Sequence, residues 1–221
     1  MFHNLTLDLR LLRRFHSYFR GMIKWFTILI SCFFWTNGQA QLRNFINIYE
    51  DDFAQAYAEH PEIPKGLLEA IAYNRSNIRF IDEAELESCT GLPKSFGVFG
   101  LIEDGKGYFN NTLTMVSDLS GREIRDILNY PNTHILAYAD AIALLPIEGW
   151  NGLALAQRLI QLSELPHETA SQSFALEVQT YEILSLLNNQ EFMNRLSYEV
   201  LRLDMEEIFG ENLRILSARS V

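Results

Sequence analysis

Residues 63–76 read IPKGLLEAIAYNRS, and residues 97–103 further along the chain read GVFGLIE. The first stretch predicts a helix from Pro64 to about Asn74, because its apolar residues recur at helical spacing and a proline suits a first helical turn. These apolar residues are Leu67, Leu68, Ile71 and Ala72. The second stretch begins a glycine-rich segment over 97–111, which predicts a long loop.

Helical patterns occupy most of the chain on both sides of these stretches. Helices are predicted over 43–59, 112–119, 120–129, 152–163, 171–188 and 190–208, with a further one opening at Pro131. No stretch alternates convincingly between apolar and polar residues as a half-buried strand would. The predicted fold class is therefore an all-α domain with one long glycine-rich loop.

Two local patterns add detail to these helices. Ser120 and Glu123 have the spacing of a capping box, which predicts that the helix over 120–129 begins there. In the helix over 171–188, apolar residues repeat at intervals of three and four, and we expect the aromatic part of this stripe, 174–181, to face the core. The residues of the stripe are Phe174, Val178, Tyr181, Leu184 and Leu187.

The first 40 residues have the three parts of a secretory signal peptide. Basic residues precede an apolar run from Trp25 to Trp35 that is too short to cross a bilayer, and small residues follow it. Gly38 and Ala40 fit the pockets of a signal peptidase, so we expect cleavage after Ala40. The sequence therefore predicts an exported protein, periplasmic or extracellular, with no membrane span after cleavage.

Alternatives remain open at this end of the chain. Met22 begins a compact signal of its own and is a second candidate for the true start. Residues 29–32 resemble a lipoprotein cleavage box, which would make Cys32 a lipid anchor, and an uncleaved anchor is a further alternative. The predicted organisation is a signal peptide over 1–40, a helical domain over 41–209, and a C-terminal tail or the start of a linker over 210–221.

Charge and cysteine content exclude several classes of function. The chain carries a net charge of −10, and removal of residues 1–40, with five basic residues and one acid, leaves −14. Such a charge disfavours nucleic acids and anionic membrane surfaces as partners. Cys89 is then the one remaining cysteine, so no internal disulfide is expected, and we interpret it as an inert thiol. Because His60, His134 and His167 are scattered, neither a metal site nor a cofactor is predicted.

The order of apolar helix, loop and glycine turn resembles the lytic transglycosylase branch of the lysozyme superfamily. In that family a helix ends in Glu-Ser, and a Gly-Ala-x-Gly-Leu-Met-Gln turn follows. Residues 97–102 match the turn, and residues 132–139 resemble a later helix of the family more weakly. The resemblance covers about 64–145 and implies a lysozyme-like fold whose glycine turn lines a groove for peptidoglycan.

The catalytic acid of that family is missing from its expected position. Alignment of Ser76 with the family's serine places Arg75 where the catalytic Glu stands, and a guanidinium cannot deliver the proton that glycoside cleavage needs. Glu103 replaces the glutamine of the turn. No catalytic residue is therefore assigned, although Glu103 is a fallback acid and also the expected ion-pair partner of Arg75. Glu69, six residues earlier on the helix, points away from Arg75 and is expected to be a solvated charge.

A longer resemblance rests on residues 61–73, 87–94 and 97–109. These segments look like the N-terminal region of secreted N-acetylmuramoyl-L-alanine amidases of the Bacteroidetes type, in which a lysozyme-like region without the acid precedes a zinc amidase domain. The resemblance implies peptidoglycan or its fragments as the partner, with an amidase domain in cis or in trans. The histidines that would bind the zinc have no counterpart in residues 1–221, so amidase chemistry is not assigned to them.

Each residue expected to line the groove has a plainer alternative. Tyr73 and Tyr108 would stack on sugar rings, but isolated aromatic residues more often belong to the core. Arg75 would hold an acidic ligand group, or it would pin the loop through a salt bridge. Gly97 and Gly100 would shape the groove, or they would simply allow close packing. The candidate groove residues are Tyr73, Arg75, Ser76, Gly97, Gly100, Glu103 and Tyr108.

Three functions are compatible with these patterns. The preferred one is a non-catalytic, lysozyme-like module of a cell-wall amidase system, which binds a glycan strand or a stem peptide. The second is an active muramidase or lytic transglycosylase with a displaced carboxylate, either Glu103 or one of the acids at 83, 85 and 87. The third is a structural or protein-interaction domain without a ligand.

Overall fold

The computed structural model describes residues 48–82, 92–104 and 106–218, which belong to one compact unit spanning Asn44–Val221. The predicted signal peptide, both cysteines and the acids at 83, 85 and 87 lie outside the described residues. Among the residues that are described, no helix has the length and apolar character needed to cross a membrane.

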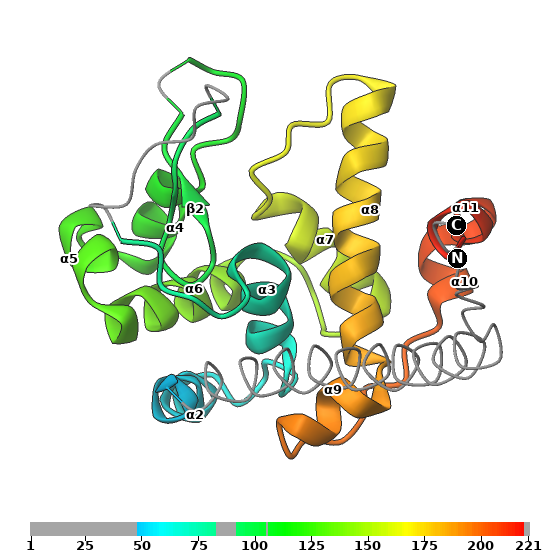
Figure 1. The fold of residues 1–221 in the computed structure, drawn as a ribbon, viewed down its shortest axis with the longest axis horizontal. Coiled ribbons are helices and arrows are strands. Elements are labelled where there is room, and N and C mark those ends of the chain that lie inside the picture. Colours follow the sequence, from blue (N-terminus) through cyan, green and yellow to red (C-terminus); the bar gives the residue numbers. More distant parts are fainter. Residues whose placement is uncertain (1–47, 83–91, 105, 219–221) are drawn as a thin grey trace, which may run out of the picture. The chain divides into compact units, whose positions relative to one another are not determined.

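The described chain is mainly helical, as predicted, with one small antiparallel sheet (Figure 1). The two strands pair Ser95 with Ile102 and Phe96 with Leu101. The elements are α2 (Glu50–Glu59), α3 (Leu67–Ser76), β1 (Ser95–Phe96), β2 (Leu101–Ile102), α4 (Thr112–Ser120), α5 (Ile124–Asn129), α6 (Pro131–Leu144), α7 (Gly152–Gln161), α8 (Ala170–Leu187), α9 (Gln190–Arg195), α10 (Met205–Phe209), the 3₁₀ turn η1 (Gly210–Asn212) and α11 (Leu213–Leu216).

Helix α3 is the most deeply buried element near the candidate site. It begins at Leu67 and not at Pro64, because Gly66 has a left-handed backbone with φ of +90° that interrupts the helix. The N–H groups of Gly66 and Leu68 are instead satisfied by the hydroxyl oxygen of Tyr57. The helix continues past the predicted end at Asn74 and stops after Ser76, where Asn77 takes a left-handed conformation.

The other helices fall into two groups on either side of α3. In the first group, α6 packs against α2, α4 and α5. In the second group, the long helix α8 packs against α3, α7 and α9, and Figure 1 shows α8 running beside α3 and α7. The aromatic centre of the first group is Phe99, which stacks on Tyr138 with 4.0 Å between ring centroids.

Two details of the helix prediction are wrong. Ser120 does not begin a capping box, because it is the last residue of α4 and its hydroxyl accepts a hydrogen bond from the N–H of Arg122. Glu123 is the N-cap of α5 but makes no side-chain cap. The stripe that starts at Phe174 faces the core only in its second half, since Leu184 and Leu187 are buried whereas Phe174 is 44% exposed. The buried residues of α8 are Leu176, Thr180, Ile183, Leu184 and Leu187.

The single helix predicted over 190–208 is two helices, α9 and α10, joined by an irregular segment. Ser197 has a φ of +61°, which a helix cannot accommodate, and the side chain of Asn188 holds the segment by bonding both the N–H and the carbonyl of Leu203. Asp204 then caps α10 through the N–H groups of Glu206 and Glu207. Residues 210–216, predicted as a tail or the start of a linker, form η1 and α11.

Candidate functional site

The C-terminal end of α3 meets the glycine turn through Ser76. Its hydroxyl donates to the carbonyl of Val98 at 2.5 Å, and its oxygen accepts the N–H of Arg79. Val98 lies in the turn between β1 and β2, so one buried serine fixes the turn against the helix. The structure therefore brings Ser76 and the glycine turn, two of the candidate groove features, into direct contact.

Both glycines of the turn have left-handed backbones, and at Gly97 the packing is also too close for a side chain. A Cβ atom at Gly97 would lie 2.0 Å from the imidazole of His134, and Gly97 has a φ of +67°. At Gly100, with a φ of +58°, a Cβ atom would lie 3.5 Å from Cβ of Arg75. Gly97 accordingly makes room for His134 and Gly100 borders Arg75, which agrees with the plainer alternative of close packing.

His134 is a buried, neutral histidine that supports the turn. Its Nε2 accepts the N–H of Phe99 at 3.2 Å, so the other ring nitrogen, Nδ1, is placed to donate to the carbonyl of Ile127. Burial lowers the pKa of His134 to about 4, although the hydrogen bond to the Ile127 carbonyl acts in the opposite direction. Both nitrogens are occupied, so His134 holds the turn and is not free to transfer protons.

Arg75 lies in the interior, not in an open groove. Its side chain is 4% exposed, and its Nη1 lies 2.9 Å from Oε2 of Glu164. Its Nη2 donates to the carbonyl of Leu162 at 3.2 Å. The predicted ion pair between Arg75 and Glu103 is wrong. Glu103 is exposed at the end of β2, and Arg75 pairs instead with Glu164 of the segment after α7.

The Arg75–Glu164 pair is embedded in a polar network. The amide of Gln179 donates to the second carboxylate oxygen of Glu164 at 2.7 Å, and Ser163 donates to Gln179. Burial raises the pKa of the Tyr138 hydroxyl, with Arg75 lowering it and Glu164 raising it, so Tyr138 lies in the field of the same pair. The ion pair and its hydrogen bonds connect α3, α8 and the segment after α7.

Glu69, at the other end of α3, is not the solvated charge that was predicted. It is 2% exposed, and the hydroxyl of Tyr57 donates to its carboxylate at 2.5 Å. Burial raises the pKa of Glu69 to about 7, while hydrogen bonds from Tyr57 and Tyr198 lower it. Helix α3 is enclosed by other elements and has no solvated face for this residue, so the carboxyl is satisfied by tyrosines.

The remaining candidate residues face in different directions. Tyr73 is half-buried and packs on Phe192 of α9, with 5.5 Å between ring centroids. Tyr108 is 70% exposed on the loop before α4. Asp104 organises this loop by accepting the N–H groups of Lys106, Tyr108 and Phe109, and these bonds lower the pKa of its carboxyl. Tyr108 is therefore an exposed ring on a hydrogen-bonded loop, whereas Tyr73 belongs to the helix packing.

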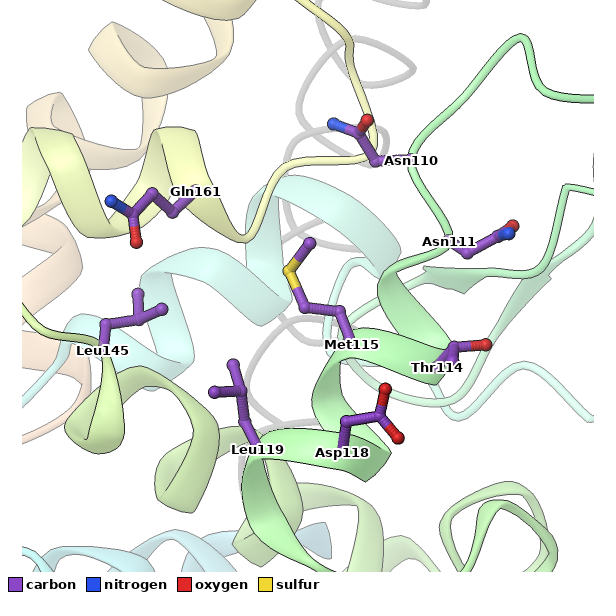
Figure 2. A pocket seen from close by; sticks show the side chains of 8 residues that line it. All are labelled: Asn110, Asn111, Thr114, Met115, Asp118, Leu119, Leu145 and Gln161. Atoms are coloured by element: carbon purple, nitrogen blue, oxygen red, sulfur yellow. The ribbon is translucent and has the colours of Figure 1, made fainter.

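A pocket of about 620 Å³ opens between the two groups of helices (Figure 2). One face of α4 provides its floor, and the ends of α6 and α7 provide the opposite wall. Asn110 joins the two sides, because its side-chain amide donates to the carbonyls of Ser163 and Leu165. The lining residues are Asn110, Asn111, Thr114, Met115, Asp118, Leu119, Leu145 and Gln161.

The sequence patterns did not single out the pocket or the two buried charge clusters. The Asn110–Asn111 doublet before a helix was a signal for a cap or a turn, but not for a pocket. The position of Glu69 within an otherwise apolar helix was a signal that the helix is enclosed. Nothing near Glu164 in the sequence identified it as the partner of Arg75.

A scan against protein-family models, a comparison with curated proteins and a comparison with solved structures each gave no match for this chain. Within the described ranges, no group of three or more His, Cys, Asp or Glu side chains gathers in a way that would hold a metal ion.

Proposed function

We propose that this protein is a peptidoglycan-associated, catalytically degenerate lysozyme-like module that binds a glycan strand or a stem peptide. The observation that carries the proposal is the position and pairing of Arg75. It stands at the end of an apolar helix, against a glycine turn, where the resembling family has its catalytic acid. The side chain at that position is locked in a buried ion pair with Glu164.

The surrounding carboxyls support a function without glycoside cleavage. A glycosidase needs a protonated carboxyl next to the leaving oxygen. Glu164 forms an ion pair with Arg75 and accepts a hydrogen bond from Gln179, and Glu103 is exposed without the apolar enclosure that catalytic acids use. Glu69 has a pKa near 7, which would suit a general acid, but it is 2% exposed and held by Tyr57. A substrate cannot reach it.

Two features support a role in binding. The pocket between the helix groups lies beside the loop that carries the exposed ring of Tyr108. Asp104 fixes the backbone of this loop, so the ring is presented on an ordered support that loses little entropy when a ligand stacks on it. In the proposed system the module holds peptidoglycan for an amidase domain, supplied in cis or in trans.

A co-sedimentation assay with insoluble peptidoglycan sacculi tests the proposal. The wild-type protein should pellet with the sacculi, and Tyr108→Ala should pellet about two- to tenfold less well, which is the range expected for one stacked aromatic ring. Tyr130→Ala is the matched control, because Tyr130 is 58% exposed on the α5–α6 junction, away from the pocket lining. Failure of the wild type to pellet would contradict the proposal.

A further inference from the structure

The pocket has a distribution of polar and apolar groups that selects one chemical class of ligand. Thr114, Met115, Asp118 and Leu119 occupy successive turns on one face of α4, because residues three and four apart are neighbours on a helix. Figure 2 shows Met115 in the middle, with the polar residues of α4 on one side of it and Leu119, Leu145 and Gln161 on the other.

The one charged side chain among the described residues that line the pocket is negative. Asp118 is exposed at the rim, and none of these described lining residues is a lysine, an arginine or a histidine. With a net charge of −10 on the whole chain, the pocket disfavours a carboxylate or a phosphate and favours a cation. An anionic ligand group would meet like charge at Asp118.

The remaining lining residues bind amide groups and aliphatic carbon. Asn110, Asn111 and Gln161 carry carboxamides. The amide of Asn110 already donates to the carbonyls of Ser163 and Leu165, and Oδ1 of Asn111 accepts the N–H of Asp104, so Asn110 offers its oxygen, Asn111 its NH₂ group and Gln161 its whole carboxamide to a peptide group. Met115, Leu119 and Leu145 provide an apolar surface, and Met115 and Leu119 lie between Gln161 and Asp118 (Figure 2). A ligand that satisfies all three kinds of group has peptide amides, an aliphatic chain and an ammonium at its end.

We infer that this pocket binds a peptide through an aliphatic side chain that ends in a primary amine. The chain lies against Met115 and the two leucines, the ammonium pairs with Asp118, and the carboxamides bond the peptide groups. The inference rests on the proposed function and deepens it, because it selects the stem peptide, and not the glycan strand, as the part of peptidoglycan that the pocket holds.

Titration of the protein with two short peptides, followed by NMR chemical shifts, tests the inference. The peptides are acetyl-Ala-Lys-Ala-amide and acetyl-Ala-norleucine-Ala-amide, which differ in the terminal ammonium and otherwise offer the same chain and amides. We expect the lysine peptide to bind about three- to fivefold more tightly, the range for one partly exposed ion pair, and to lose this preference at high salt. Equal affinity of the two peptides, or no binding of either, would overturn the inference.

Variants locate the interaction. Asp118→Asn should abolish the preference for lysine, while Asp51→Asn, the same change at an exposed acid in the first turn of α2, should leave it intact. A preference for lysine that survives Asp118→Asn would overturn the assignment to this pocket, as would tighter binding of an N-acetylglucosamine oligomer than of the lysine peptide.

The inference and the proposed function fail in different ways. If wild-type protein pellets with sacculi and shows no lysine preference, the pocket assignment is wrong and the proposed function stands. If the protein does not pellet with sacculi but distinguishes the two peptides through Asp118, the pocket assignment stands for an amine-bearing peptide from another source, and the proposed function is wrong.

Discussion

The two ends of α3 each bury an ionisable side chain, and they neutralise it in different ways. At the C-terminal end, Arg75 meets the opposite charge of Glu164 in a network that also contains Gln179. At the N-terminal end, the carboxyl of Glu69 accepts hydrogen bonds from the hydroxyls of Tyr57 and Tyr198, and burial raises its pKa to about 7. One helix therefore accommodates a buried cation by pairing it with a carboxylate, and a buried carboxyl by favouring its protonated, uncharged form.

The same comparison separates binding from catalysis. Arg75 occupies the position next to the glycine turn, but its side chain is 4% exposed and pairs with Glu164. Glu69 titrates near neutrality, but it lies at the opposite end of the helix and is 2% exposed. The carboxyl whose pKa would suit a general acid therefore lies at the opposite end of α3 from the glycine turn.

Breaking the pair at the C-terminal end should have the largest effect. Arg75→Met leaves the carboxylate of Glu164, 17% exposed, without its cation, so we expect a loss of about 3–5 kcal/mol in the free energy of unfolding, measured by urea denaturation. Arg195→Met is the matched control, because Arg195 forms an exposed ion pair with Glu191 within one helix and should cost about 0.5 kcal/mol or less.

A double variant checks the cause of that loss. Arg75→Met combined with Glu164→Gln removes both charges and should recover at least half of the lost stability. If Arg75→Met alone costs less than about 1 kcal/mol, the buried ion pair does not hold this end of α3.

The glycine turn that covers this end of α3 should be the next most sensitive feature. Gly97→Ala drives a Cβ atom into His134 and strains a left-handed backbone, so we expect a cost of about 3 kcal/mol in thermal or urea denaturation. Gly121→Ala has almost the same φ, +68°, but nothing within 4 Å of the added atom, so it should cost only about 1 kcal/mol. Equal costs for the two variants would mean that the turn does not pack tightly on His134.

The conditional charge at the N-terminal end should appear as a pH dependence. The folded pKa of Glu69, about 7, lies above its ordinary value of 4.5, so the native state binds the extra proton between these values. Stability therefore falls as pH rises through this window, by roughly 3 kcal/mol at most. The Glu69→Gln variant has no carboxyl to deprotonate at this position, so its stability relative to the wild type should increase between pH 4.5 and 7. A constant difference across this range would show that Glu69 does not titrate there.

His134 changes the stability with pH in the opposite direction, and the Glu69→Gln variant makes this change easier to observe. Because its folded pKa of about 4 lies below the ordinary 6.5, His134 contributes stability above pH 6.5 that is lost as pH falls toward 4. In the wild type the two residues partly offset each other between these values. In Glu69→Gln the acid loss from His134 should therefore be steeper than in the wild type.

The two tyrosines around Glu69 should differ in their effects, and these are the smallest changes. Tyr57 is buried and its hydroxyl serves Gly66, Leu68 and Glu69, so Tyr57→Phe should cost about 2 kcal/mol. Tyr198 is half-exposed, so water replaces its hydroxyl and Tyr198→Phe should cost about 1 kcal/mol or less. Calorimetric unfolding of both variants measures these costs. A larger loss of stability in Tyr198→Phe than in Tyr57→Phe would contradict the larger contribution expected from Tyr57.

Local rules predicted the helices well and the partners of buried charges poorly. The apolar spacing of 67–72 and the glycines at 97 and 100 were sufficient to expect a helix and a turn, and Ser76 then joined them. The buried side of α8 was predicted only in part, because its apolar residues are not confined to one face: Leu184 and Leu187 are buried as expected, but Leu176 and Ile183 are buried in place of Phe174. Glu164 and Tyr198 are distant in sequence from the charges that they serve, and only packing brings them together.

The central claim, binding of peptidoglycan without cleavage, is tested most directly in one tube. Purified protein is mixed with insoluble sacculi, the pelleted protein is quantified, and released muropeptides in the supernatant are analysed by mass spectrometry. We predict that the protein pellets and that no muropeptides are released. Release of muropeptides above the level of a buffer control would contradict this prediction. It would mean that a carboxylate elsewhere in the protein catalyses the cleavage, since residue 75 is an arginine.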